Sequence, residues 1–95
     1  MTQATVKTTT THDRMALVTT FANGDQFKFS ITRSGESIRF AQFPKNPPIT
    51  KADMKALQKM TDFRKDESNL QRFERIVAIC KSAVDMADLV SKAAA

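Results

Sequence analysis

The stretch Gln26–Thr32 alternates strictly between polar and apolar side chains, and this pattern constrains the fold more than any other feature of the chain. Its two phenylalanines and its isoleucine fall on one side of an extended backbone, because successive strand residues point to opposite faces. The preceding Asn23-Gly24 pair is the strongest short-range signal for a β-hairpin. The segment is therefore predicted to be a half-buried strand, joined by a hairpin to the apolar run Met15–Phe21.

Two further segments extend this sheet. Ser37–Phe43 alternates again after a second turn at Ser34-Gly35, so residues 13–43 are predicted to form a three-stranded antiparallel meander. Threonine favours strands, and Thr5–Thr11 is rich in it. Residues 1–12 are therefore either a fourth strand at the edge of the sheet or a disordered tail.

The second half of the chain carries two helix-start signals. Three prolines within residues 44–48 end the sheet, because proline has no backbone donor for a ladder. Thr50 and Asp53 then match the cap and third position of a first helix, which is predicted to reach residue 63 or 64. Ser68 and Gln71 mark a second helix, whose apolar pattern continues to Lys92 without a stop signal.

Together these segments predict an α+β fold in a single domain of residues 1–95, with a three- or four-stranded antiparallel β-meander followed by two C-terminal α-helices in residues 49–94. Asp85 and Asp88 are assigned to the solvated side of the second helix. Cys80 is the only cysteine, which predicts a buried structural thiol. The predicted core consists of Phe21, Phe27, Phe29, Ile31, Ile38, Phe40, Leu57, Phe73, Val77, Cys80 and Val84.

The net charge of +5 is distributed unevenly, since residues 26–65 hold nine basic and three acidic residues. Lys51, Lys55 and Lys59 recur every fourth residue of the first predicted helix and would form one ridge. Like charges at this spacing repel by roughly 0.2–0.5 kcal/mol per pair, so the ridge is not explained by helix stability. A polyanionic partner is the simplest explanation, and a purely solvated helix face is the alternative.

The sheet supplies a second set of candidate binding residues. Lys28 and Arg39 occupy outward strand positions, and Phe43 shares the face of Arg39. Single-stranded nucleic acid is commonly held by such a combination, in which cations contact phosphates and bases stack on aromatic rings. The alternative is that Phe43 turns into the core while the two cations only solubilise the sheet.

Catalytic and metal-binding motifs are not recognisable in the sequence. His12 is the only histidine, and both glycines are explained by turns, so no catalytic triad, metal site or phosphate-cradling loop is expected. No cofactor is predicted, and enzymatic activity is not expected. The polar N-terminal region and the short apolar runs predict a cytoplasmic protein without a membrane partner.

These observations predict a non-catalytic protein that binds nucleic acid, or a complex carrying it, through Lys28, Arg39, Phe43, Lys51, Lys55 and Lys59. The alternative is a protein–protein interaction or homodimerisation module that uses the widely apolar second helix, and an acidic protein surface could also satisfy the basic residues.

In topology, a meander followed by a helix with a basic outer face is similar to small single-strand-binding transcription cofactors. In size and lack of catalytic parts the chain resembles phage proteins that dock on host machinery, anti-CRISPR proteins included. The second likeness implies a role as an inhibitor or regulator of a host nucleic-acid complex.

Overall fold

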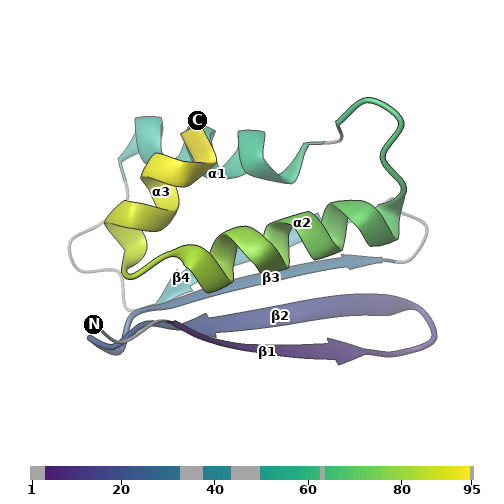
Figure 1. The fold of residues 1–95 in the computed structure, drawn as a ribbon, viewed down its shortest axis with the longest axis horizontal. Helices are drawn as coiled ribbons and strands as arrows, with labels where there is room; N and C mark the ends of the chain where they lie inside the picture. The colour runs from purple at the N-terminus through teal and green to yellow at the C-terminus, as the bar shows by residue number, and fades with distance from the viewer. Residues whose placement is uncertain (1–3, 33–37, 44–49, 63, 95) are drawn as a thin grey trace.

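The computed structural model describes residues 4–32, 38–43, 50–62 and 64–94, with residues 38–43 described by their backbone alone. Four strands precede three helices along the chain (Figure 1). Their bounds are β1 Thr5–Thr10, β2 Arg14–Thr20, β3 Gln26–Thr32, β4 Ile38–Phe43, α1 Lys51–Thr61, α2 Asn69–Ser82 and α3 Met86–Ala94.

The strands form one antiparallel sheet in the order β1-β2-β3-β4, which confirms the predicted α+β meander. The Thr5–Thr10 segment is an edge strand, as one of the two interpretations of residues 1–12 expected. The register pairs Leu17 with Phe29 and Met15 with Ile31, so the apolar positions of neighbouring strands share one face. This inner face of the sheet lies under the helices.

The predicted hairpin between β2 and β3 is confirmed at residues 21–25. The Phe21 amide donates to the Asp25 carbonyl at 2.9 Å, and the Gly24 amide donates to the Phe21 carbonyl at 2.9 Å. Gly24 has φ +93°, a conformation that a residue with a Cβ rarely adopts. The Asn23 side-chain oxygen accepts from the Asp25 amide at 3.0 Å and fixes the turn from within.

The helices cover the inner face in two steps (Figure 1). α2 lies along the sheet against β1 and β2, and the ring of Phe73 stacks on that of Phe29 with centroids 6.4 Å apart. α1 packs mainly on α3, which also contacts α2. The lysine-bearing helix is therefore held in place largely by other helices.

Most of the predicted core is confirmed. Phe21, Phe27, Phe29, Ile31, Leu57, Phe73 and Cys80 are buried. Val77 and Val84 are only partly buried, because Ile76 and Ala83 occupy the innermost positions beside them. The side chains of Ile38 and Phe40 lie outside the described residues.

The prediction of one long second helix is wrong, because α2 ends at Ser82 and α3 begins at Met86. Ala83 is extended, with φ −80° and ψ 143°. Asp85 accepts a hydrogen bond from the Asp88 amide at 2.7 Å, and Asp88 accepts one from the Val84 amide at 3.0 Å. The two aspartates therefore cap α3 and do not line the solvated side of a continuous helix.

The break has a packing reason. A straight helix as long as the predicted one would extend beyond a sheet of ordinary strand length and leave its last apolar turns uncovered. Folding back instead buries Met86, Leu89 and Ala93 of α3 within the core. The chain thereby gains the surface on which α1 packs.

Candidate functional site

The start of α1 is set by the predicted capping box. The Thr50 hydroxyl accepts from the Asp53 amide at 3.1 Å, and the Asp53 carboxylate accepts from the Thr50 amide at 3.4 Å. These bonds satisfy amides that have no partner within the helix. The helix therefore begins at Lys51, which places the first of the three lysines in its first turn.

Lys51, Lys55 and Lys59, here called the lysine row, are exposed along one side of α1. Leu57 and Met60 are fully buried on the opposite side of the same helix. At 1.5 Å rise per residue, the row places a lysine about every 6 Å over about 12 Å. Within the described part of the chain, none of the three ammonium groups forms an ion pair. The three lysines therefore form one exposed strip of positive charge, with which no acidic side chain of the described ranges pairs.

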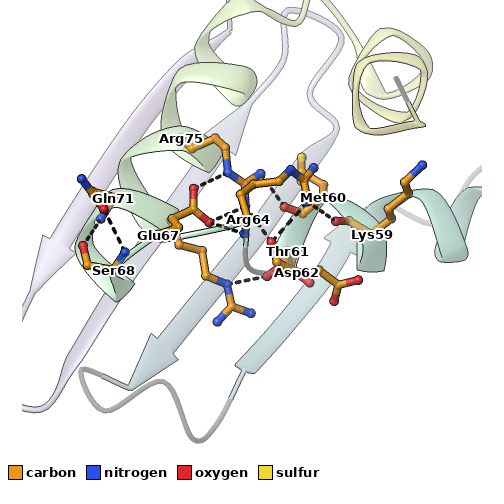
Figure 2. A network of polar contacts seen from close by, with 10 residues as sticks. Lys59, Met60, Thr61, Asp62, Arg64, Glu67, Ser68, Gln71 and Arg75 are labelled. Atoms are coloured by element: carbon orange, nitrogen blue, oxygen red, sulfur yellow. Dashed lines mark hydrogen bonds and ion pairs between the residues drawn. The ribbon is translucent and has the colours of Figure 1, made fainter.

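The other end of α1 is held by an arginine from α2 (Figure 2). The Arg75 guanidinium donates to the carbonyls of Met60 and Asp62, both at 2.8 Å. It also binds both carboxylate oxygens of Glu67, at 2.7 and 3.1 Å. This bidentate pairing of a guanidinium with a carboxylate is among the strongest hydrogen-bonded contacts between side chains. Arg75 thus ties the end of α1 to the loop that leads into α2.

Two more arginines reach the same helix end. Arg72, only 2% exposed, donates from Nε to the Thr61 carbonyl. Arg64 donates to the carbonyls of Lys59 and Asp62 at 3.3 and 3.4 Å. The last carbonyls of a helix have no partner within the helix and form the negative end of its dipole, so cations are stabilising there.

We call Arg64, Arg72, Arg75 and Glu67 the arginine clamp. The hydrogen bond from Arg75 is the main cause that lowers the pKa of the Glu67 carboxyl, although partial burial opposes it. Burial, and secondarily the charge of Arg75, lowers the pKa of the Arg72 guanidinium. Figure 2 shows the Lys59 side chain extending away from the clamp, although the carbonyl of the same residue belongs to it.

The clamp changes how the local excess of positive charge is interpreted. Arg64 is one of the nine basic residues of positions 26–65, yet its guanidinium donates to carbonyls at the end of α1. Sequence reasoning missed the clamp altogether. Its one sequence signal is Arg72, a long cation next to Phe73 on the side of α2 that packs into the core.

The sheet presents a second basic surface on the side that faces away from the helices, here called the outer sheet face. Its described cations are Lys7, Arg14 and Lys28. The register aligns Lys7, Val18 and Lys28 across three strands, so the two lysines stand about 10 Å apart. Arg14 donates to the Ser30 hydroxyl at 3.0 Å.

Arg39 and Phe43 belong to β4, whose side chains lie outside the described residues. The backbone register pairs Arg39 with Ser30 and Phe43 with Gln26. The predicted joint contact of an arginine and an aromatic ring with nucleic acid therefore stays a prediction.

The structure places those predicted binding residues whose side chains it describes on two sides of the molecule. Lys28 lies between Phe27 and Phe29, which are both buried beneath the helices, so Lys28 points to the outer sheet face. The lysine row belongs to α1, on the helical side of the sheet (Figure 1). A ligand at the lysine row and a ligand at Lys28 would therefore approach from different directions.

The cysteine and the histidine of the chain belong to neither of the two basic surfaces. Cys80 is fully buried, and burial is the main cause that raises the pKa of its thiol to about 11. His12 is exposed in the turn between β1 and β2. In the described ranges, no cluster of histidine, cysteine and acidic residues could hold a metal ion. None of the described helices has the length and apolar character needed to cross a bilayer.

Comparison of this chain with protein families, curated proteins and solved structures found no match. The expected likenesses to single-strand-binding cofactors and to phage inhibitors therefore stay predictions. The lysine row and the outer sheet face are therefore the features of this chain that bear on function.

Proposed function

We propose that this protein is a non-catalytic binding protein that engages nucleic acid through the lysine row of α1, by contacts to phosphates. The observation that carries the proposal is the set of three exposed lysines at regular spacing, none of which forms an ion pair among the described residues. Cations that are not neutralised within the protein remain available to a polyanion.

The cost of the row supports the same proposal. Lys51 and Lys55, and again Lys55 and Lys59, are like charges four residues apart, a spacing that destabilises a helix. Lys51 also lies in the first turn, near the positive end of the helix dipole. A ligand that supplies negative charge along the row would relieve both unfavourable interactions.

Phosphate contacts would make such binding strong at low salt and independent of sequence. Three contacts predict a slope of log K against log salt of about −2 for single strands and about −3 for duplex DNA. Between 50 and 200 mM salt the affinity is then expected to fall roughly 20- to 40-fold. The outer sheet face has its cations farther apart, and its Arg14 is engaged by Ser30, so its contribution is expected to be smaller.

The test is fluorescence polarisation of labelled single- and double-stranded DNA and RNA across a salt series. Lys51, Lys55 and Lys59 are replaced together by glutamine, which keeps helix propensity and removes the charges. Loss of binding and of the salt slope in this variant is the expected result.

A matched control changes Lys7, Lys28 and Lys65 to glutamine, which alters net charge by the same three units away from the row. Circular dichroism of both variants is the check that they fold. Equal loss of affinity in both variants would show that binding does not favour the lysine row over the outer sheet face, and it would overturn the assignment to α1. If the unmodified protein binds no nucleic acid at low salt, the proposed function is wrong and acidic protein surfaces become the next candidates.

A further inference from the structure

A groove of about 600 Å³ runs between the edge strand β1 and the helix α2, away from the lysine row. Thr8, Thr10 and Met15 line it from the sheet, and Leu70, Phe73 and Val77 line it from the helix. Leu70 is 56% exposed, although it belongs to the apolar side of α2 that faces this groove. The groove is thus an apolar surface that the described part of the chain leaves uncovered.

The edge strand beside the groove offers a second kind of contact. Within the described sheet, β1 pairs with β2 alone, so its far edge presents backbone donors and acceptors that no strand uses. Such an edge is a template for pairing with another strand. Thr8 and Thr10 lie both on this strand and in the wall of the groove. A ligand that pairs with β1 would therefore also cover the groove.

We propose that the occupant is a second copy of this chain, joined through antiparallel pairing of β1 with β1 around a two-fold axis. The pairing would create one continuous eight-stranded sheet and set the two α2 helices side by side above its centre. Packed helices stand 8–10 Å apart, about twice the strand spacing of 4.7–4.9 Å. Each α2 lies against β1 and β2 of its own copy. In the joined sheet each helix therefore covers two strands, and the distance between the two helix axes matches that of packed helices.

The charges on the flank of α2 select a second copy over an unrelated strand. Glu74 and Lys81 both line the groove, on either side of Val77 and Ala78. Neither forms an ion pair among the described residues. A two-fold axis makes the two α2 helices antiparallel. Glu74 of each copy therefore approaches Lys81 of the other copy. The surface is therefore complementary in charge to itself, as an isologous interface requires.

The pattern of β1 also restricts the register of the pairing. Val6, Thr8 and Thr10 lie on the helix side, because they are paired with Thr19, Leu17 and Met15. In the joined sheet, both sets of helices lie on the same face only if even-numbered residues of one β1 stand opposite even-numbered residues of the other. Placing Lys7 on the axis would set two like charges face to face, which is unfavourable. The preferred register places Thr8 on the axis, because it avoids this contact and still pairs residues 6–10 of the two copies.

Light scattering and sedimentation equilibrium of the full chain, without nucleic acid, test this proposal. The expected result is a concentration-dependent dimer with about twice the chain mass of 10.6 kDa. The Glu74→Lys variant has two positive charges at positions 74 and 81, and the Lys81→Glu variant has two negative ones. Measured separately, each should raise the dimer dissociation constant by at least about tenfold, because like charges then meet across the interface. An equimolar mixture of the two should restore association as a heterodimer, because every contact between flanks then joins opposite charges.

Further variants separate this interface from unfolding and from overall charge. Leu70→Ser removes an exposed apolar contact of the groove and should weaken the dimer while leaving the unfolding of the monomer almost unchanged. Lys65→Glu makes the same charge change as Lys81→Glu in the loop before α2 and should leave association unaffected. A protein that stays monomeric at millimolar concentration, or a mixture that fails to recover association, would overturn the proposal. The outcome does not depend on the proposed function, since no nucleic acid is present.

Discussion

At the scale of single residues, Arg75 makes the most informative set of contacts. Its guanidinium donates to two carbonyls at the end of α1 and to both oxygens of Glu67. Five donors in a rigid fork allow one side chain to serve a helix end and a loop together. The orientation of α1, and with it the direction of the lysine row, therefore depends on this residue.

Replacing Arg75 by methionine should lower the free energy of unfolding by about 2–3 kcal/mol, because hydrogen bonds from a charged group are lost and Glu67 is left without its partner. Urea unfolding followed by circular dichroism measures the change. Arg75→Lys keeps the charge but cannot make the forked contact, so most of the loss should remain. A change below about 0.5 kcal/mol in the methionine variant would show that the contacts contribute little, as surface substitutions do.

Glu67 should make stability depend on pH in a defined direction. Its folded-state pKa lies below the ordinary 4.5, so its contribution is fully present above that value and is lost as pH falls through the folded-state pKa. The free energy of unfolding is therefore expected to decline below pH 4.5. Glu67→Gln should start less stable at neutral pH and show a shallower decline. Parallel curves for the two proteins would contradict this assignment.

At the scale of elements, the ends of the helices are set by short local pairs. Thr50 with Asp53, and Ser68 with Gln71, form complete capping boxes. The start of α3 uses the same chemistry, with Asp85 accepting from the amide three residues later. Lys92 adds a contact at 3.1 Å to Asp88, and the bond from the Val84 amide is the main cause that lowers the pKa of this carboxyl.

Asp85→Ala should therefore destabilise the protein by about 1 kcal/mol, the usual cost of losing an N-cap. Asp85→Asn keeps an accepting oxygen and should stay within a few tenths of a kcal/mol of the unmodified protein. Thermal unfolding of both variants provides the measurement. Equal stability of alanine and asparagine at this position would mean that the cap is not what holds the start of α3.

The elements differ in how well the sequence predicts them. The strands and the first two helix starts follow from alternation, the Asn23-Gly24 turn and the capping boxes, which act over a few residues. The break at Ala83 could not be predicted in the same way, because the apolar pattern runs through it without proline or glycine. The arginine clamp joins the end of α1 to residues 64–75, and such contacts exist only after the helices have packed. Of the predicted binding residues, the lysine row was foreseeable from spacing alone, whereas its separation from Lys28 required the fold.

At the scale of the whole molecule, the layers differ in how they are supported. The sheet and α2 bury large apolar side chains against each other, including the stacked Phe29 and Phe73. α1 depends mainly on α3, through a core that includes Leu57, Met60 and Leu89. The position of the lysine row, the surface proposed to bind nucleic acid, therefore depends on the packing of α1 against α3.

Leu89→Ala should consequently lower the free energy of unfolding by about 2–4 kcal/mol, through lost burial and the cavity that remains. Amide hydrogen exchange should show the largest acceleration in α1 and α3, with β2 and β3 less affected. Ser91→Ala, at an exposed position of the same helix, is the control and should change little. Uniform acceleration across the sheet and the helices would show that the layers open together.

The lysine row also implies a conflict between stability and activity. Lys55 takes part in both repulsive pairs of the row, so Lys55→Gln should stabilise the folded protein by about 0.4–1 kcal/mol at low salt. The same change removes the central phosphate contact and should weaken binding. Selection for stability alone would discard Lys55, whereas selection for binding would keep it. Added salt should separate the two properties, because screening relieves the repulsion within the lysine row while it weakens the complex.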